Sequence, residues 1–240
     1  GVSNTTQVTT LSLTSTGGLN SAFNSTGYVV ETSVGASSGY DLLLNGTALS
    51  VAGFTQTSTP SVINYNSGTG ARNTIIGNNG VQTFKNYTSG ILYNIKTTTG
   101  ALRYAAGQSN SIAFVGGLQD QTGLLKDTAS PFNTGANGFI YTTTLDQSGN
   151  VVVGGQYNFG ALSVRYTNTA GRDGTFGNNG VANLTALATT ATIQKIINSG
   201  TGYLATGVSN STQVTTLLLT SAGGLNSAFN STGYVVETSV

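Results

Sequence analysis

The sequence predicts an all-β protein built from tandem four-stranded modules of about 51 residues. Three observations support this prediction. Short runs of Val, Ile, Leu, Tyr and Thr alternate with segments rich in Gly, Asn and Ser, as is typical of strands and turns. A hairpin-like segment recurs four times. No stretch shows a sustained apolar period of 3.6 residues with capping residues, so we expect few helices.

A long repeat joins the two ends of the chain. Residues 207–240 copy residues 1–34 at an offset of 206. The two copies differ only at Thr5/Ser211, Ser12/Leu218 and Thr16/Ala222. This near-identity indicates a unit of 206 residues followed by an overlap into the next unit. We therefore expect the chain to be a segment of a longer repetitive protein.

A shorter period lies within the 206-residue unit. Each hairpin-like segment ends in a glycine, and these glycines are 54, 48 and 52 residues apart. The four segments are residues 40–53, 90–107, 138–155 and 192–207. Asn45-Gly46 in the first segment predicts a type I′ turn, which needs positive φ at both central residues. Each segment therefore predicts two antiparallel strands.

The other strands of a module flank a second recurring feature, an apolar residue four places before a glycine. The pairs are Phe23 and Gly27, Ile76 and Gly80, Phe176 and Gly180, and Phe229 and Gly233. One strand is expected after each pair, and one before it, at residues 61–65 and 162–166. In the second module Phe132 and Gly135 remain, but the strand that should follow them is shortened. A module thus has about four strands.

Alignment of the modules shows which face of the preceding strand is apolar. Positions 11, 63, 164 and 217 are always aliphatic, and positions 13, 65, 166 and 219 are Leu or Tyr. The residues between them vary: Ser12, Asn64, Arg165 and Leu218. This period of two predicts a strand with one constant apolar face and one variable face.

The two periods divide the chain into one partial and four complete modules. The partial module is residues 1–34, and the others are residues 35–87, 88–136 (degenerate), 137–187 and 188–240. A sheet of this size must stack on its neighbours to cover both faces. Four-stranded units with a period of 40–50 residues are typical of β-propeller blades, and an open all-β solenoid would show the same period. We predict β-propeller blades, with an open all-β solenoid or superhelical stack of sheets as the alternative.

One segment resembles a known repeat. Residues 165–181, RYTNTAGRDGTFGNNGV, are similar to the bacterial delta-60 repeat, a predicted β-propeller repeat of large secreted proteins. The matching positions are Arg165, Tyr166, Asp173, Phe176, Gly177 and Gly180. Ile76 replaces the phenylalanine in the first module, and Asn226 and Asn230 replace the acid and the first glycine in the fourth. The resemblance implies a propeller-like architecture and a secreted bacterial protein, and it implies no catalytic residue.

The composition argues against nucleic-acid binding, membrane insertion, carboxylate catalysis and calcium binding. The chain has no His or Cys, 6% charged residues and a net charge of +1, which gives no basic surface for nucleic acid. No apolar run reaches the roughly 18 residues of a membrane span, so we expect no membrane insertion. The carboxylates show no spacing typical of a catalytic pair or a calcium loop. They are Glu31, Asp41, Asp120, Asp127, Asp146, Asp173 and Glu237.

The remaining motifs also lack the context that an active site needs. Residues 77–80 and 177–180 read GNNG, but no lysine and helix follow as in a phosphate loop. No Ser-x-x-Lys occurs that could activate a serine without histidine. We therefore predict no enzyme, no catalytic, cofactor-binding or metal site, and no cofactor.

The prediction for function is structural. A nearly uncharged surface favours association, and a tandem array needs copies of one unit. We expect a segment of an extracellular or cell-surface filament, stalk or adhesin shaft that assembles with copies of itself by sheet stacking or strand addition. The alternative is a propeller-type module that binds surface glycans or proteins. For that alternative the strand tyrosines could offer stacking platforms, although core packing also explains them: Tyr65, Tyr93, Tyr104, Tyr141 and Tyr166.

Overall fold

The computed structural model describes residues 2–3, 7–56, 58–84, 87, 89–98, 103–118, 125–126, 138–168, 171–188 and 190–237. Every regular element among these residues is a β-strand, so the all-β prediction is confirmed. No helix with the length and apolarity of a membrane span occurs among them. Phe132 and Gly135 of the degenerate module, and the carboxylates Asp120 and Asp127, lie outside the described residues.

Four antiparallel sheets of four strands follow one another along the chain. The first has β4 (Ser38–Asn45), β5 (Ala48–Thr55), β6 (Thr59–Asn66) and β7 (Val81–Thr83). The second has β8 (Gly90–Thr97), β9 (Arg103–Ser109), β10 (Ile112–Leu118) and β11 (Leu125–Lys126). The third has β12 (Gly138–Leu145), β13 (Val151–Tyr157), β14 (Gly160–Tyr166) and β15 (Val181–Asn183). The fourth has β16 (Ala191–Asn198), β17 (Gly202–Ser209), β18 (Gln213–Thr220) and β19 (Tyr234–Val236).

A smaller sheet precedes these four. It contains β1 (Val2–Ser3), β2 (Gln7–Leu11) and β3 (Tyr28–Val30), in that order. By the 206-residue repeat, β2 and β3 correspond to β18 and β19, and β1 corresponds to the end of β17. Among the described residues this sheet has no counterpart of β16.

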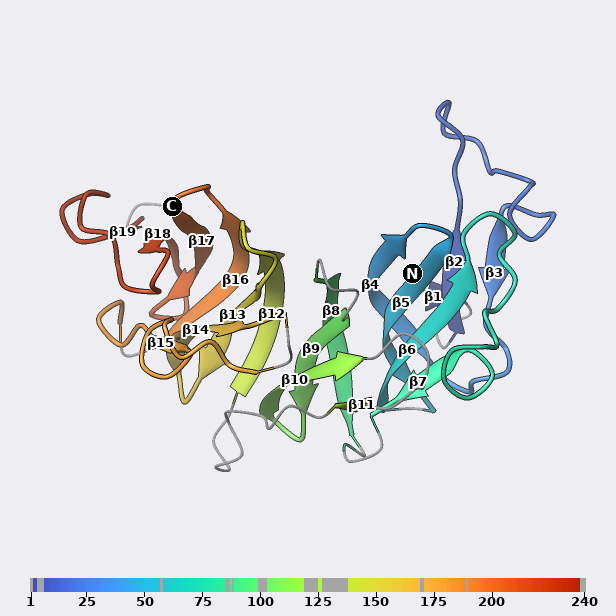
Figure 1. Ribbon diagram of the computed structural model, residues 1–240, viewed down its shortest axis with the longest axis horizontal. Coiled ribbons are helices and arrows are strands. Elements are labelled where there is room, and N and C mark those ends of the chain that lie inside the picture. Colours follow the sequence, from blue (N-terminus) through green and yellow to red (C-terminus); the bar gives the residue numbers. More distant parts are fainter. Residues whose placement is uncertain are drawn as a thin grey trace.

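The sheets stand face to face in a curved row (Figure 1). Their first strands, β4, β8, β12 and β16, contact one another in chain order and so lie on one side of the row. The β1–β3 sheet and the β16–β19 sheet lie at opposite ends, with open space between them (Figure 1). The described residues therefore form blade-like sheets in an open arc, and not a closed ring.

The core is divided among the interfaces between neighbouring sheets, which we call joints. Strands in the middle of the row are buried on both faces, and every residue of β14 is buried. This explains why the variable face of the third strand is not simply exposed: Asn64 is 0% exposed and Arg165 is 9% exposed. The side chains of that face meet the following sheet, so their variation reflects what each joint contains.

The first strand of each complete sheet carries a β-bulge at the same place. The pairing register shifts by one residue around Tyr40, Tyr93, Tyr141 and Gln194. A bulge leaves the extra residue unpaired and bends the strand. Three of the four bulges therefore present a tyrosine in the same orientation along the row.

The tight turns differ in one respect from the sequence prediction. In the first hairpin Asn45 pairs with Ala48, so the turn residues are Gly46 and Thr47. Gly46 alone of these has positive φ, at 58°. The predicted type I′ turn at Asn45-Gly46 is therefore wrong. Positive φ at both turn residues occurs instead between the second and third strands, at Asn110-Ser111 and Asn158-Phe159.

Candidate assembly interface

The best candidate site in this chain is the joint between neighbouring sheets, because it carries the buried charges and most of the core. The joint between the β1–β3 and β4–β7 sheets shows the plan. One apolar cluster fills it, consisting of Val8, Val34, Val51, Ile63 and Tyr65 with partly buried Val29, Leu49 and Val81. The backbone amide of Val8 donates to the Ser37 hydroxyl at 3.1 Å. The middle strand of the smaller sheet, β2, is thus held by both apolar and polar contacts.

Polar contacts close the rim of this joint. The Arg72 guanidinium pairs with the Glu31 carboxylate, and it donates to the Ser33 hydroxyl at 3.1 Å. The backbone amide of Asn24 donates to the Thr69 carbonyl at 2.8 Å. Burial lowers the pKa of Arg72, and the nearby carboxylate compensates the charge. These contacts fix how the two sheets face each other.

An arginine also closes the next joint, between the β4–β7 and β8–β11 sheets. Arg103 on β9 is 2% exposed and reaches back into the preceding sheet. It donates to Ser50 Oγ at 2.6 Å, Asn64 Oδ1 at 2.7 Å and Gln82 Oε1 at 3.0 Å. Each acceptor comes from a different strand, so one side chain ties β5, β6 and β7 to β9.

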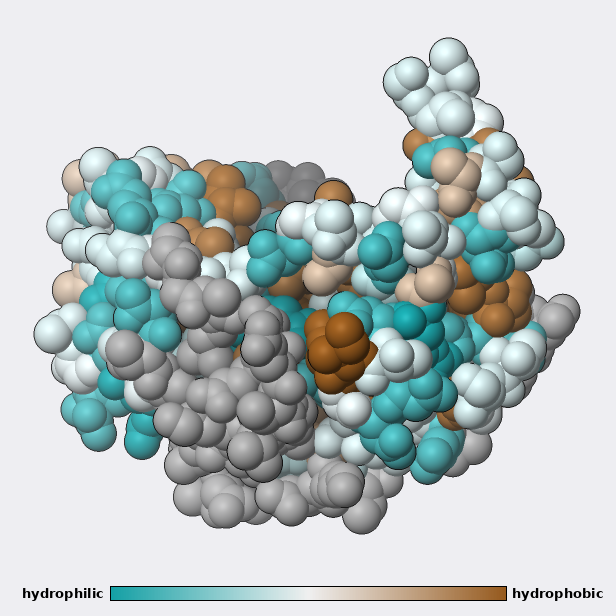
Figure 2. Space-filling model, turned by 45° about the vertical axis from the view of Figure 1, so that its right-hand side comes forward, coloured by the Kyte–Doolittle hydropathy of each residue, from teal (hydrophilic) through white to brown (hydrophobic). Residues whose placement is uncertain are grey.

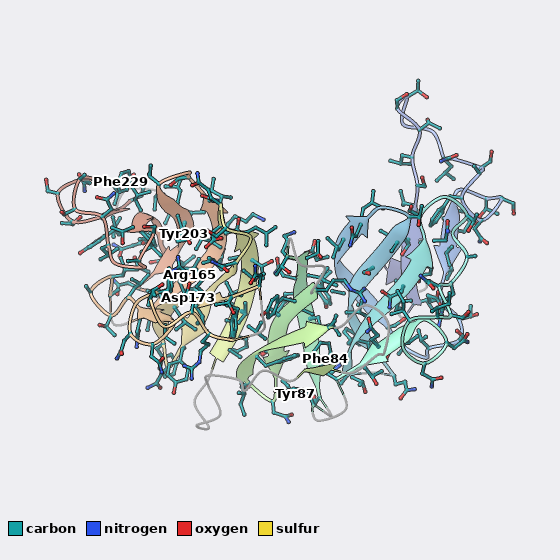
Figure 3. All side chains as sticks on the ribbon, viewed as in Figure 1. Phe84, Tyr87, Arg165, Asp173, Tyr203 and Phe229 are labelled. Carbon is teal, nitrogen blue, oxygen red and sulfur yellow. The ribbon has the colours of Figure 1, made fainter. Side chains whose placement is uncertain are left out.

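An aromatic cluster lies at the outer side of the same joint, near the lower edge of the view in Figure 3. Phe84 is 1% exposed and lies 5.5 Å from Phe114 between ring centroids. Tyr87 stacks on Phe114 at 4.3 Å. A Cβ on Gly116 would come within 2.1 Å of the Phe84 ring, so only glycine leaves room for this ring.

The joint between the β12–β15 and β16–β19 sheets is built around Arg165. Its Nε donates to Asp173 at 2.8 Å, and its Nη1 donates to the Ser221 carbonyl at 2.7 Å and the Tyr203 hydroxyl at 3.2 Å. The guanidinium lies 5.0 Å from the centre of the Phe176 ring. Figure 3 shows Arg165, Asp173 and Tyr203 close together between the two sheets. Arg165 on β14 thus connects the loop that contains Asp173 to the following sheet.

The structure brings two carboxylates to Arg165 that the sequence did not relate. Asp146 lies 3.8 Å from its Nη1 and also accepts from the backbone amides of Ser148 and Asn150. Asp173 accepts from the hydroxyl and amide of Thr175. The hydrogen bond from the Thr175 hydroxyl and the charge of Arg165 lower the pKa of Asp173. Both carboxylates accept hydrogen bonds within turns and neutralise the charge of Arg165, so their roles are structural.

The other carboxylates are dispersed. Asp41 accepts from the backbone amide of Ile95 at 3.0 Å and lies 3.8 Å from Lys96 Nζ. Glu31 is buried at the first joint, whereas Glu237 is exposed at the far end of the chain. Among the described residues no group of three or more acidic, His or Cys side chains could hold a metal ion.

The tyrosines divide into a buried core set and a row in which Tyr40 is exposed and Tyr93 and Tyr141 are partly buried. Tyr65, Tyr104 and Tyr166 are 0% exposed, as core packing requires. At the bulges, by contrast, Tyr40 is 51% exposed, and its ring lies 5.5 Å from Tyr93. Tyr93 lies 5.9 Å from Tyr141. We call Tyr40, Tyr93 and Tyr141 the tyrosine row.

The buried tyrosines predict a loss of stability in alkali. Burial raises the pKa of Tyr65 and Tyr166 above the usual value, which is about 10 in an unfolded chain. Their contribution is therefore complete below pH 10 and is lost as the pH rises above it. Each should cost about 1.4 kcal/mol per pH unit. Urea unfolding between pH 9 and 11 measures the slope. The Tyr65→Phe/Tyr166→Phe variant should show a shallower slope, and an unchanged slope would contradict the prediction.

Sequence reasoning missed the three arginines that close the joints. The sequence patterns do not single out Arg72 or Arg103, and they place Arg165 only on a variable strand face and in the delta-60 resemblance, with no role assigned to its charge. Their scarcity was an available signal, because the chain has only eight Lys and Arg residues. No protein-family model matches the chain, and no curated protein matches it. The resemblance to the delta-60 repeat stays a prediction.

Proposed function

We propose that this chain is a structural repeat segment of an extracellular or cell-surface filament, stalk or adhesin shaft. One observation carries the proposal. The near-identical residues 1–34 and 207–240 contribute equivalent strands, β2 and β3 from one segment and β18 and β19 from the other, to sheets at opposite ends of the same row (Figure 1). A repeat that recurs in register with the stacking of sheets suits an array that continues beyond one unit.

The surface is consistent with this role. Among the described residues on the face shown in Figure 2, hydrophilic and near-neutral side chains predominate, and the hydrophobic side chains form separate groups. The charged side chains that the joints use are turned inward, as Arg103 and Arg165 show. A shaft needs rigid contacts between its sheets and a surface with few charged groups. The buried arginines supply the first and the low content of charged residues supplies the second.

Electron microscopy of native material or of a multi-unit chain tests the proposal. We expect filaments whose axial repeat is commensurate with the 206-residue unit. Discrete soluble monomers that stay monomeric at high concentration would contradict it.

The tyrosine row favours a second candidate function, binding of surface glycans. Aromatic rings on the first strands of three successive sheets offer apolar faces with hydroxyl groups at their edges. Gln108 donates to the Tyr93 hydroxyl at 3.0 Å, which orients that ring.

A binding experiment separates this candidate from the shaft. If the row binds glycans, the Tyr40→Ala/Tyr93→Ala variant should lose about tenfold in affinity for any glycan that a glycan array identifies. Tenfold corresponds to about 1.4 kcal/mol, which the lost burial of two aromatic side chains can supply. Phe159→Ala is the matched control, because Phe159 is 52% exposed on a turn outside the row. An array without a positive glycan, or equal losses in both variants, would remove the candidate.

A further inference from the structure

The two copies of one repeat expose opposite faces of the same strand. In the first copy Val8 is 1% exposed and Leu11 is 54% exposed. In the second copy the corresponding residues are reversed: Val214 is 44% exposed and Leu217 is 1% exposed. The β2 strand packs on the sheet that follows it, whereas β18 packs on the sheet that precedes it. Each copy therefore leaves uncovered the face that the other copy buries.

The outer face of the β16–β19 sheet therefore repeats residues that residues 7–34 use to pack on the β4–β7 sheet. Residues that hold the first copy in its joint recur there in an uncovered state. Glu31 is 5% exposed and paired with Arg72, whereas its copy Glu237 is exposed. Phe23 is 1% exposed, whereas Phe229 is only partly buried and lies at the outer end of the row (Figure 3).

The receiving face, on the β4–β7 sheet, is only partly covered by residues 7–34. Leu42 on β4 is 59% exposed. The residues at its position in the other first strands are buried: Ile95 at 0%, Thr143 at 3% and Ile196 at 1%. The difference arises because those three strands pack on complete preceding sheets, whereas the described part of the β1–β3 sheet has no counterpart of β16.

A pocket marks the uncovered part of the receiving face. It has a volume of about 450 Å³. It lies between β2 and β4, lined by Thr10 and Leu11 on one side and by Gly39, Tyr40 and Leu42 on the other. A complete sheet in place of the β1–β3 sheet would bring strands equivalent to β16 and β17 to this position.

We propose that the β16–β19 sheet of one chain docks on the β4–β7 sheet of a second, identical chain and displaces residues 7–34 of that second chain. The proposal rests on the proposed structural function and specifies its joint. Val214 of the first chain takes the place of Val8 of the second chain, and Glu237 of the first chain pairs with Arg72 of the second. The backbone amide of Asn230 takes the place of that of Asn24 at the Thr69 carbonyl. Within a single chain, residues 7–34 thus occupy the surface of the β4–β7 sheet that the second chain would otherwise cover, and we call them the stand-in segment.

The complete sheet has the advantage over the stand-in segment for a simple reason. It presents the same contacts as residues 7–34 and adds the apolar side chains of β16 and β17, among them Ile197, which is 48% exposed. Docking would bury Leu42 as well, and burial of apolar area is the dominant favourable contribution to association. The two faces are different surfaces at opposite ends, so the contact is head-to-tail and can propagate from copy to copy.

An introduced disulfide tests the contact between copies. The chain has no cysteine, so no native thiol interferes. A Cβ on Gly70 would lie 3.0 Å from the Cβ of Asn24, about 0.5 Å short of the ~3.5–4.5 Å of a disulfide. Gly70 has a φ of 70°, so the two variants that carry Gly70→Cys share the same backbone strain and can be compared with each other. The full-length Gly70→Cys/Asn230→Cys variant should give a ladder of covalent oligomers under oxidation. The matched Gly70→Cys/Asn24→Cys variant should close the bond within one chain and remain a monomer. A monomeric Gly70→Cys/Asn230→Cys variant, beside a control that closes its bond, would overturn the proposal.

A charge reversal tests the displacement. Glu31→Arg places two arginines together and should release residues 7–34, so the mean molar mass measured by light scattering should be at least twice that of a single chain. Adding Glu237→Arg removes the incoming partner of Arg72, and the mass should fall to that of a single chain. The proposal fails if Glu31→Arg stays monomeric, or if it associates equally with and without Glu237→Arg.

The outcomes distinguish this joint from the proposed function. Closed rings of covalently linked copies would support the joint and contradict the shaft. Filaments whose copies cannot be linked through Gly70→Cys and Asn230→Cys would support the shaft and overturn this joint.

Discussion

Replacing Arg103 by leucine is expected to lower the free energy of unfolding by about 3–5 kcal/mol. The side chain is 2% exposed, and its guanidinium satisfies acceptors on Ser50, Asn64 and Gln82. Leucine is shorter and donates no hydrogen bond, so three buried hydrogen bonds to a charged group would be lost, although Asn64 Oδ1 still accepts from Ser50 and Gln82 Oε1 still accepts from Asn64. A hydrogen bond to a charged group contributes ~1.5–3 kcal/mol, and three are lost at once.

Arg172→Leu is the matched control for this experiment. Arg172 is exposed, so the same exchange should change stability by at most about 0.5 kcal/mol. Urea unfolding followed by circular dichroism measures both variants. Equal effects of the two substitutions would show that Arg103 does not hold the second joint together.

Replacing Phe176 by alanine is expected to cost about 3–5 kcal/mol. The ring is 0% exposed and lies 5.8 Å from Tyr203 in an edge-on arrangement. It also fits against Gly223, where a Cβ would come within 2.9 Å of the ring. Gly223 has φ of 86°, which favours glycine. Truncation would leave a cavity between two sheets that neither can fill without moving.

The repeat supplies an internal control for this loss. Phe229 occupies the same position in the last module but is only partly buried, because no described sheet follows it. Phe229→Ala should therefore cost less than about 1.5 kcal/mol in the same unfolding experiment. If both substitutions cost the same, position in the repeat and not coverage by the next sheet would determine the energy.

Much of the fold could be predicted because strands and their turns leave local signals. Alternating apolar residues and recurring glycines placed the hairpins, and the four complete sheets contain them. The first turn was mispredicted because Asn45-Gly46 is a favourable pair for a type I′ turn, yet the pairing of Asn45 with Ala48 moved the turn by one residue. The register along two whole strands outweighed a local preference of two residues.

The candidate interface could be predicted only in outline. Its apolar positions were visible in the aligned modules, but the partners of Arg72, Arg103 and Arg165 were not. Arg103 and Ser50 are 53 positions apart, and no local pattern relates two residues at such a distance. The tyrosine row was likewise hidden, because a bulge and not a sequence period turns Tyr93 and Tyr141 toward Tyr40.

The sequence by itself determined the all-β class, the module length and the 206-residue repeat, since each depends on residues close in the chain or on direct comparison of segments. Only the tertiary structure decided that the row stays open, which charges are buried at the joints, and which face of each repeat copy is covered. Val8 and Val214 show the reason most simply. They are the same residue in the same repeat, and one is buried and the other exposed because burial depends on the neighbouring sheet and not on the strand itself.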